Sequence, residues 1–340
     1  MNSSTSVTND KTVAARTSTH SRLGKKRWIL WPVLGLLAIL VITAGGYALF
    51  RPRVRPLKMP AVPSQLSATD LGLVQWQGYQ RPLPAHPLDN PSLPSPPQAR
   101  PEIALLEDAA GQWLIQRGQL EHGFAYLKAA AEADPDNLRY SNDYRLALRD
   151  HQRYMEEENF FAPLAQKLKT PNASINLALT YVDEMRACPK PPDGLVCQAQ
   201  YSSRSISTLN TVLEKNPYNI VARYARGLNN LYWPTLMGHL PKAQEDLQFA
   251  VALAQYQNAI STAFTPQAYT ALGDVFAKDG KIDEARNVWL NGLNVAAQKS
   301  LLESRLSIPQ EQLVSEEENH LRGLGVYVDT DIALFWQKGR

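Results

Sequence analysis

The feature that most constrains how this chain can fold is a repeat of about 34 residues, which runs from residue 102 to residue 300. The repeat is clearest in the unit that starts at Pro266 and contains the run YTALGDVFAKDGKIDEARNVWLNGL. Its signature residues are Tyr269, Leu272, Gly273, Phe276, Gly280, Ala285, Trp289 and Gly292. A period of this length indicates pairs of helices that stack on one another and bury a continuous core.

The same spacing recurs upstream. In the unit that starts at Ala104, the corresponding positions hold Gly111, Leu114, Gly118, Gly123, Leu127, Ala130 and Pro135. Small residues at these positions let two helices approach closely, and the proline ends the second helix before the next unit begins. Further units start at Leu138, Asn172 and Ile220, although the Leu138 unit keeps few signature residues beyond Phe161.

Two units keep the spacing only if residues are inserted between their helices. The Asn172 unit needs an insertion of about 14 residues, and the Ile220 unit needs about four within WPTLMGHLP. Such insertions form loops on one face of a repeat array, often the binding face. We therefore predict five helical pairs over 102–300, followed by a capping segment, 301–340, in which Phe335 and Trp336 close the open end of the stack.

These units resemble the tetratricopeptide-repeat (TPR) family, most specifically in the first and fifth units. An irregular helical domain with fortuitous glycine and alanine spacing is the alternative, and two strong units in one phase argue against it. The resemblance implies an all-α solenoid that binds a protein partner and has no catalytic role, but it does not name the partner.

In this family, set positions of the first helix of each unit line a concave binding face. Here those positions are mostly polar, and the predicted partner-binding residues are Asp108, Gln112, Arg139, Asn142, Asn176, Thr180, Thr270 and Asp274. The Ile220 unit differs, because Tyr224, Tyr232 and Trp233 predict an aromatic anchor, with ordinary helix packing as the alternative. The Lys–Asn pair with which some cochaperones of this family grip acidic C-terminal peptides is absent, so no client with an acidic tail is indicated.

Upstream of the repeats, residues 28–50 form a charge-free apolar run, long enough to cross a hydrocarbon core of about 30 Å. We predict a transmembrane helix there, preceded by a polar basic tail, 1–27; a cleaved signal peptide is the alternative. Six Lys/Arg residues precede the run and four follow it closely. This asymmetry favours a cytoplasmic tail and extracytoplasmic repeats, which in a bacterium would lie in the periplasm, with 28–50 in the inner membrane.

The charge distribution supports membrane proximity rather than nucleic-acid binding. The chain has a net charge of +3, but residues 1–58 carry +9 and the remainder carries −6. The basic excess therefore borders the predicted span, where it can contact anionic lipid headgroups. We predict no nucleic-acid partner.

Between the span and the repeats, residues 51–101 contain 12 of the 24 prolines of the chain. This composition predicts an extended linker with a reach of up to roughly 160 Å that lifts the solenoid away from the bilayer. The apolar run LGLVQWQGY, 71–79, could dock on the repeats or on another protein, or it could remain solvated within the linker.

Cys188 and Cys197 are the only cysteines, and both lie in the insertion of the Asn172 unit. Such a local pair predicts a structural disulfide in an oxidising compartment, with free thiols as the alternative. Their spacing does not match the CxxC motif of redox-active pairs.

Catalytic signatures are missing from the sequence: it has no GxGxxG, GxxxxGK[ST], HExxH, GxSxG or CxxC motif, and its six histidines are scattered. We predict no enzyme activity, no cofactor and no metal site. The predicted function is a membrane-anchored adaptor or scaffold that assists the assembly or chaperoning of an envelope or membrane complex. The alternative is a stoichiometric structural subunit of a membrane protein complex.

Overall fold

A computed structural model describes residues 54–254 and 261–337. The predicted tail, 1–27, and the predicted transmembrane helix, 28–50, lie outside the described residues. The described residues belong to one compact unit. None of the helices in the described ranges has the length and apolar character that a membrane crossing requires.

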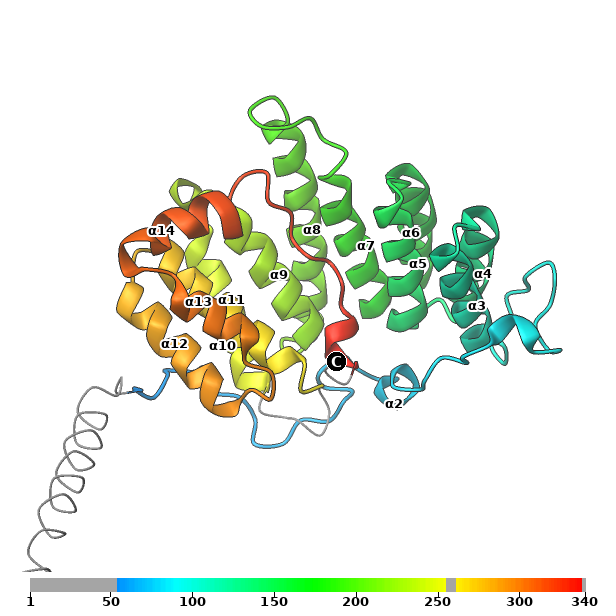
Figure 1. Cartoon of the computed structure of the whole chain (residues 1–340), viewed down its shortest axis with the longest axis horizontal. Helices are drawn as coiled ribbons and strands as arrows, with labels where there is room; N and C mark the ends of the chain where they lie inside the picture. The colour runs from blue at the N-terminus through cyan, green and yellow to red at the C-terminus, as the bar shows by residue number, and fades with distance from the viewer. Residues whose placement is uncertain (1–53, 255–260, 338–340) are drawn as a thin grey trace, which may run out of the picture. The chain divides into compact units, whose positions relative to one another are not determined.

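The compact unit is built from five consecutive pairs of helices, each packed on the next (Figure 1). The pairs are α3 (Ala104–Gln116) with α4 (Leu120–Ala133), α5 (Leu138–Asp150) with α6 (Tyr154–Leu168), α7 (Pro171–Glu184) with α8 (Leu195–Lys215), α9 (Ile220–Tyr232) with α10 (Leu240–Ala254), and α11 (Phe264–Lys278) with α12 (Ile282–Val295). The first helix of every pair begins within about two residues of its predicted start. The described residues contain no β-strand, and the prediction of an all-α fold is confirmed.

The glycines of the repeat explain how closely the helices of a pair approach. A Cβ atom added at Gly111 would lie 2.5 Å from Cγ of Leu127, and one at Gly273 would collide with the indole of Trp289. Polar side chains cap the starts of α5, α7 and α9, as at Asn219, whose side-chain oxygen accepts a hydrogen bond from the N–H of Ala222 at 2.9 Å. The close approach at the glycines is the one that the repeat pattern predicts.

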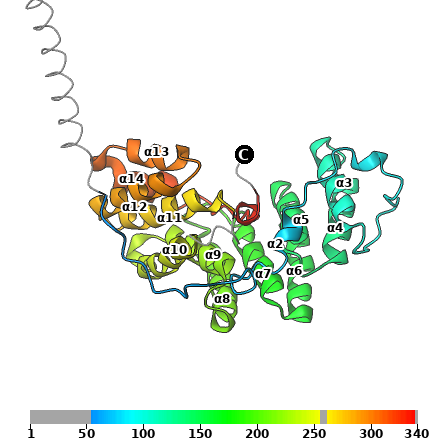
Figure 2. The same cartoon turned by 90° about the horizontal axis from the view of Figure 1, so that it is seen from below.

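Residues 54–101, which the sequence predicts to be an extended linker, instead form a strap packed along the helices. The backbone of Arg55 exchanges hydrogen bonds with the Asn287 side chain of α12, at 2.7 and 3.0 Å. Further along, the N–H of Ile220 donates to the carbonyl of Leu71 at 3.1 Å, and the Tyr126 hydroxyl donates to the carbonyl of Pro94 at 2.8 Å. The strap therefore runs from the last helix pair back to the first (Figure 1 and Figure 2).

The apolar run 71–79 explains why the strap docks. Leu71 and Leu73 are fully buried in the main core, and Tyr79 is nearly so. Proline-rich backbone needs few internal hydrogen bonds, so it can follow the helices while these side chains enter the core. The strap includes the short helices α2 (Trp76–Tyr79) and η1 (Pro87–Asp89). Of the alternatives for this run, docking on the repeats is the one that the structure shows.

The predicted capping segment divides into two parts with different positions. The short helices α13 (Ser300–Ser307), η3 (Gln310–Gln312), α14 (Leu313–Glu316) and η4 (Glu317–Leu321) cover the last helix pair. Leu302 and Leu313 are fully buried there, in the same apolar cluster as Trp289. Beyond them the chain turns back as a return segment, residues 323–337, which ends in η5 (Ala333–Phe335) (Figure 1).

Phe335 and Trp336 lie in the return segment, not in the cap that the sequence predicts. The ring centroid of Phe335 lies 4.6 Å from that of Phe264 in α11 and 5.9 Å from that of Tyr224 in α9. The ring centroid of Trp336 lies 5.0 Å from that of Tyr79 in the strap. The open end is already covered by Leu302 and Leu313, so these aromatic side chains are buried elsewhere.

Candidate partner-binding site

The predicted binding face is formed by the first helix of each pair, and most of its predicted residues are buried. Fully buried are Asp108, Asn142, Asn176, Thr180 and Asp274, while Arg139, Thr270 and Tyr224 are at most 8 % exposed. Gln112 is half-buried and donates to Asp143 at 3.0 Å. These side chains therefore make contacts within the chain, and few of them are open to a partner.

The return segment covers much of this first-helix face. Asn142 of α5 donates to Asp331 at 3.1 Å and accepts from the N–H of Ile332 at 3.3 Å. The Thr330 hydroxyl donates to Asp183 of α7 at 2.7 Å. With Phe335 packed on α9 and α11, the chain's own C-terminal part occupies the place that the sequence predicts for a partner peptide.

A buried ion pair between Arg145 and Asp183 lies beneath the return segment. Both side chains are fully buried, and Arg145 also donates to the carbonyl of Thr330. Arg145 is absent from the sequence prediction, although a signal for it exists. It stands at the position that holds Gly111 in the first unit, where an arginine is out of place unless it is buried with a partner.

Two buried carboxyl groups, Glu157 beside Asp183 and Glu317 beside Asp274, have raised pKa values that favour their neutral forms at pH 7. Burial, and then the negative charge of Asp183, raise the pKa of Glu157 to about 10. Burial and the charge of Asp274 raise the pKa of Glu317 to about 9. Neither group therefore adds a negative charge beside its neighbouring aspartate.

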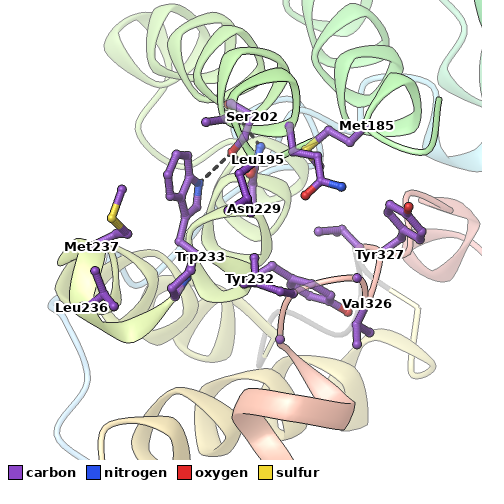
Figure 3. A pocket seen from close by; sticks show the side chains of 17 residues that line it. Met185, Leu195, Ser202, Asn229, Tyr232, Trp233, Leu236, Met237, Val326 and Tyr327 are labelled. Atoms are coloured by element: carbon purple, nitrogen blue, oxygen red, sulfur yellow. Dashed lines mark hydrogen bonds between the residues drawn. The ribbon is translucent and has the colours of Figure 1, made fainter. Parts of the chain in front are cut away.

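Of the three predicted aromatic anchors, Tyr224 is 5 % exposed and packed against Phe264 and Phe335, which is the helix-packing alternative. Tyr232 and Trp233 are half-buried, and both line an open pocket of about 360 Å³. Both insertions contribute to its wall: Leu195, between Cys188 and Cys197, belongs to the first, and Trp233, Pro234, Leu236 and Met237 belong to the second. The return segment, residues 323–328, completes it (Figure 3).

Trp233 is held in a fixed orientation at this pocket. Its indole Nε1 donates to the Ser202 hydroxyl at 2.7 Å, and that hydroxyl donates to Asn229 (Figure 3). On its other side the indole stacks in parallel on the His239 imidazole, with ring centroids 4.2 Å apart. Partial burial lowers the pKa of His239, which favours the neutral ring at pH 7.

A polar network behind the pocket joins the end of α9 to Arg322, the residue before the return segment. The buried Lys278 donates to the carbonyls of Leu231, Trp233 and Arg322, at 2.9, 2.9 and 2.7 Å. Arg322 in turn donates to the Tyr232 hydroxyl at 2.8 Å and pairs with Asp274 at 2.9 Å. Asp274, predicted to contact a partner, is thus buried support for the pocket wall.

Exposed apolar side chains surround the pocket mouth. Leu236 is 87 % exposed, Met237 53 % and Leu324 49 %, and all three line the pocket. Val196, in the first turn of α8, is 70 % exposed. Exposed apolar residues that gather in this way mark interaction sites, whereas single ones are common on any surface.

The chemistry of this pocket is that of a binding site. Its lining consists mostly of apolar side chains, with amides from Asn229 and Gln198 and hydroxyl-bearing side chains from Ser202, Tyr232 and Tyr327, and it contains no charged side chain.

Cys188 and Cys197 form a disulfide across the α7–α8 insertion, with Cα atoms 5.9 Å apart. Among the described residues no three His, Cys, Asp or Glu side chains gather where they could hold a metal ion.

No protein-family model and no curated protein matches the chain. Among solved structures it is similar to the crystal structure of TTC0263, a thermophilic TPR protein of Thermus thermophilus, with 18% sequence identity and a TM-score of 0.46. The match covers 62% of this chain and 99% of that chain.

Proposed function

We propose that the chain is a membrane-anchored adaptor or scaffold that binds a protein partner at the pocket beside Trp233. The observation that carries this proposal is the contrast between two surfaces. The first-helix face is covered by the return segment, whereas the pocket is open and bordered by Leu236, Met237 and Leu324. The partner-contacting residues of the proposal are therefore Tyr232 and Trp233, with this apolar rim.

Simple energetics support a protein partner at this pocket. Burial of one large apolar side chain stabilises a complex by about 1.5–3 kcal/mol, and the exposed rim offers further apolar contact. Trp233 is already fixed by Ser202 and His239, so little side-chain entropy is lost when a partner covers it. Ordered tryptophan and tyrosine side chains are also the residues that most often dominate binding energy.

The membrane anchor and the extracytoplasmic location belong to the same proposal. They rest on the apolar run 28–50 and on the excess of Lys/Arg residues before it. The Cys188–Cys197 disulfide supports them, because disulfides persist in oxidising compartments and are rare in the cytosol.

Thiol labelling of intact cells tests this location. We expect a membrane-impermeant reagent to label Cys188 and Cys197 only after a reductant has been added to the cells, because the two thiols are paired on the outer side. A chain with both cysteines replaced by serine controls for background. Labelling that requires lysis but no reductant would place the repeats in the cytoplasm and contradict the proposal.

Photo-cross-linking in cells tests the pocket. We expect a photoreactive residue at Leu324 to form a covalent adduct with another protein, and one at Met155, 78 % exposed on α6, to form none. In the Leu324-labelled chain, Leu236→Glu should reduce the adduct about tenfold or more, because a carboxylate would lose hydration against an apolar partner. Leu236 is 87 % exposed, so this substitution leaves the fold intact.

Equal adduct yields at Leu324 and Met155 would contradict a partner site at the pocket. So would an adduct at Leu324 that Leu236→Glu leaves unchanged.

A further inference from the structure

The pocket wall includes an amide side chain, that of Gln198, whose nitrogen lacks a hydrogen-bond partner within the described parts of the chain. Gln198 of α8 lines the pocket, and its side-chain Nε2 atom has no hydrogen-bond partner among the described residues. The same atom is shielded from solvent. By contrast, Ser202 and Asn229 bond to each other, and the Tyr232 hydroxyl accepts from Arg322. A shielded amide without a partner is unfavourable, so a ligand gains affinity if the amide rotates about its terminal torsion into the pocket and pairs with it.

The chemistry of a carboxamide restricts what that ligand can be. Its nitrogen donates and its oxygen accepts, which are the same two functions that a peptide group offers in return. The terminal torsion of glutamine is broad, so the amide can turn to meet a peptide N–H or a peptide carbonyl. A hydrocarbon chain offers neither group.

The rest of the lining sets the charge and character of the ligand. No charged side chain lines the pocket, so a charged group that entered it would lose its hydration without compensation. The apolar rim at Leu236, Met237 and Leu324 continues the apolar surface outward from the pocket. A segment that leaves the pocket would therefore meet apolar surface on both sides, which favours a chain with several apolar residues.

We propose that the pocket binds an uncharged peptide segment of the partner, with one large apolar side chain beside Trp233 and a peptide group paired with the Gln198 carboxamide. This inference rests on the proposed function, since it takes the pocket to be the partner site. It adds the chemical class of the partner and names Gln198 as the residue that distinguishes a peptide from a lipid chain.

Calorimetric titration of the full chain in detergent tests this recognition. The probes are tetrapeptides with an acetylated N-terminus and an amidated C-terminus, which differ only in one residue: Phe, Leu or Asp. We expect the Phe and Leu peptides to bind at least tenfold more tightly than the Asp peptide. Gln198→Leu should weaken the Phe peptide about three- to tenfold, the range for a lost neutral hydrogen bond.

Gln200 provides the matched control. It is exposed on the same helix and does not line the pocket, so Gln200→Leu should leave peptide affinity unchanged. Gln198→Leu should not lower the melting temperature, because it removes an unpaired amide and keeps a side chain of similar size. A loss of affinity without a loss of stability therefore reports recognition.

Ester substitution makes the test specific for a peptide group. Each backbone amide of the Phe peptide is replaced in turn by an ester, which removes one N–H and weakens one carbonyl acceptor. At one position we expect weaker binding to the wild-type chain but no further loss in Gln198→Leu, because the two changes remove the same hydrogen bond. If the losses of binding free energy from the ester and from Gln198→Leu are additive at every position, the pairing with Gln198 is overturned.

A lipid probe separates the remaining outcomes. A monoacylglycerol could bind the pocket as tightly as the Phe peptide does, with an affinity that Gln198→Leu leaves unchanged. That result would assign the pocket to acyl chains and overturn the inference. If no tetrapeptide binds while the Leu324 cross-link to a protein persists, the peptide inference fails and the proposed function stands. If the cross-link is also absent, both fail.

Discussion

Phe335→Ala is expected to lower the free energy of unfolding by about 3–5 kcal/mol, the usual range when a fully buried phenylalanine is truncated. Phe335 is fully buried between Phe264 of α11 and Tyr224 of α9, although it lies only a few residues from the end of the chain. A C-terminal residue in a free tail would cost almost nothing to replace. The loss of unfolding free energy in Phe335→Ala therefore reports whether the return segment is part of the core.

Urea denaturation of the full chain, monitored by far-ultraviolet circular dichroism, measures the loss of stability as a lower urea concentration at the unfolding midpoint. Leu236→Ala is the matched control, because Leu236 is apolar but 87 % exposed, and it should change stability by no more than about 0.5 kcal/mol. A loss below about 1 kcal/mol for Phe335→Ala would mean that the return segment leaves the first-helix face in solution. That face would then be open to a partner.

Arg145→Met is expected to destabilise the chain by about 3–5 kcal/mol, because it leaves the buried carboxylate of Asp183 without the buried cation that bonds to it directly. Asp183 would keep the hydrogen bond from Thr330 and the Nε of Arg186 at 3.7 Å, but that guanidinium is partly exposed and neither group replaces the direct, buried contact with Arg145. Protonation of the neighbouring Glu157 cannot relieve the imbalance, since burial and Asp183 raise its pKa to about 10 and already favour its neutral form at pH 7. The substitution also removes the bond from Arg145 to the Thr330 carbonyl, which anchors the return segment.

Two further variants distinguish the buried ion pair from a general effect of losing arginine. Arg204→Met removes an arginine whose side chain is 59 % exposed and which approaches Glu158 at 3.9 Å, so the expected loss is at most about 1 kcal/mol. Arg145→Met combined with Asp183→Leu should recover at least half of the loss, because no charge is then left buried alone. Additive losses in the double variant would contradict the pairing.

Parts of this fold could be predicted because their causes are local in the sequence. The starts of α3, α5 and α9 match the predicted unit starts, and Gly111 and Gly273 lie where helices touch. Helical periodicity and glycine at close contacts act over a few residues, so one sequence is enough to reveal them. The two insertions were also predicted, and both contribute to the wall of the pocket.

The candidate site could be predicted only in part. Tyr232 and Trp233 were identified from the aromatic character of their unit, but Gln198 and the rim of the pocket were not. Asp108, Asn142 and Asn176 lie on the first-helix face as the register places them, yet they are fully buried. A polar residue at a binding position and a polar residue that bonds within the protein look the same in one sequence.

The sequence by itself determined the helical pairs and their order, because each pair follows from short-range periodicity and small residues at the helix contacts. Only the tertiary structure decided which surfaces stay open. The bond from Asn142 to Asp331 spans 189 positions of the chain, and that from Arg55 to Asn287 spans 232. Such contacts leave no periodic trace, because their partners come together only when burial of Leu71, Leu73 and Phe335 brings the strap and the return segment onto the stack.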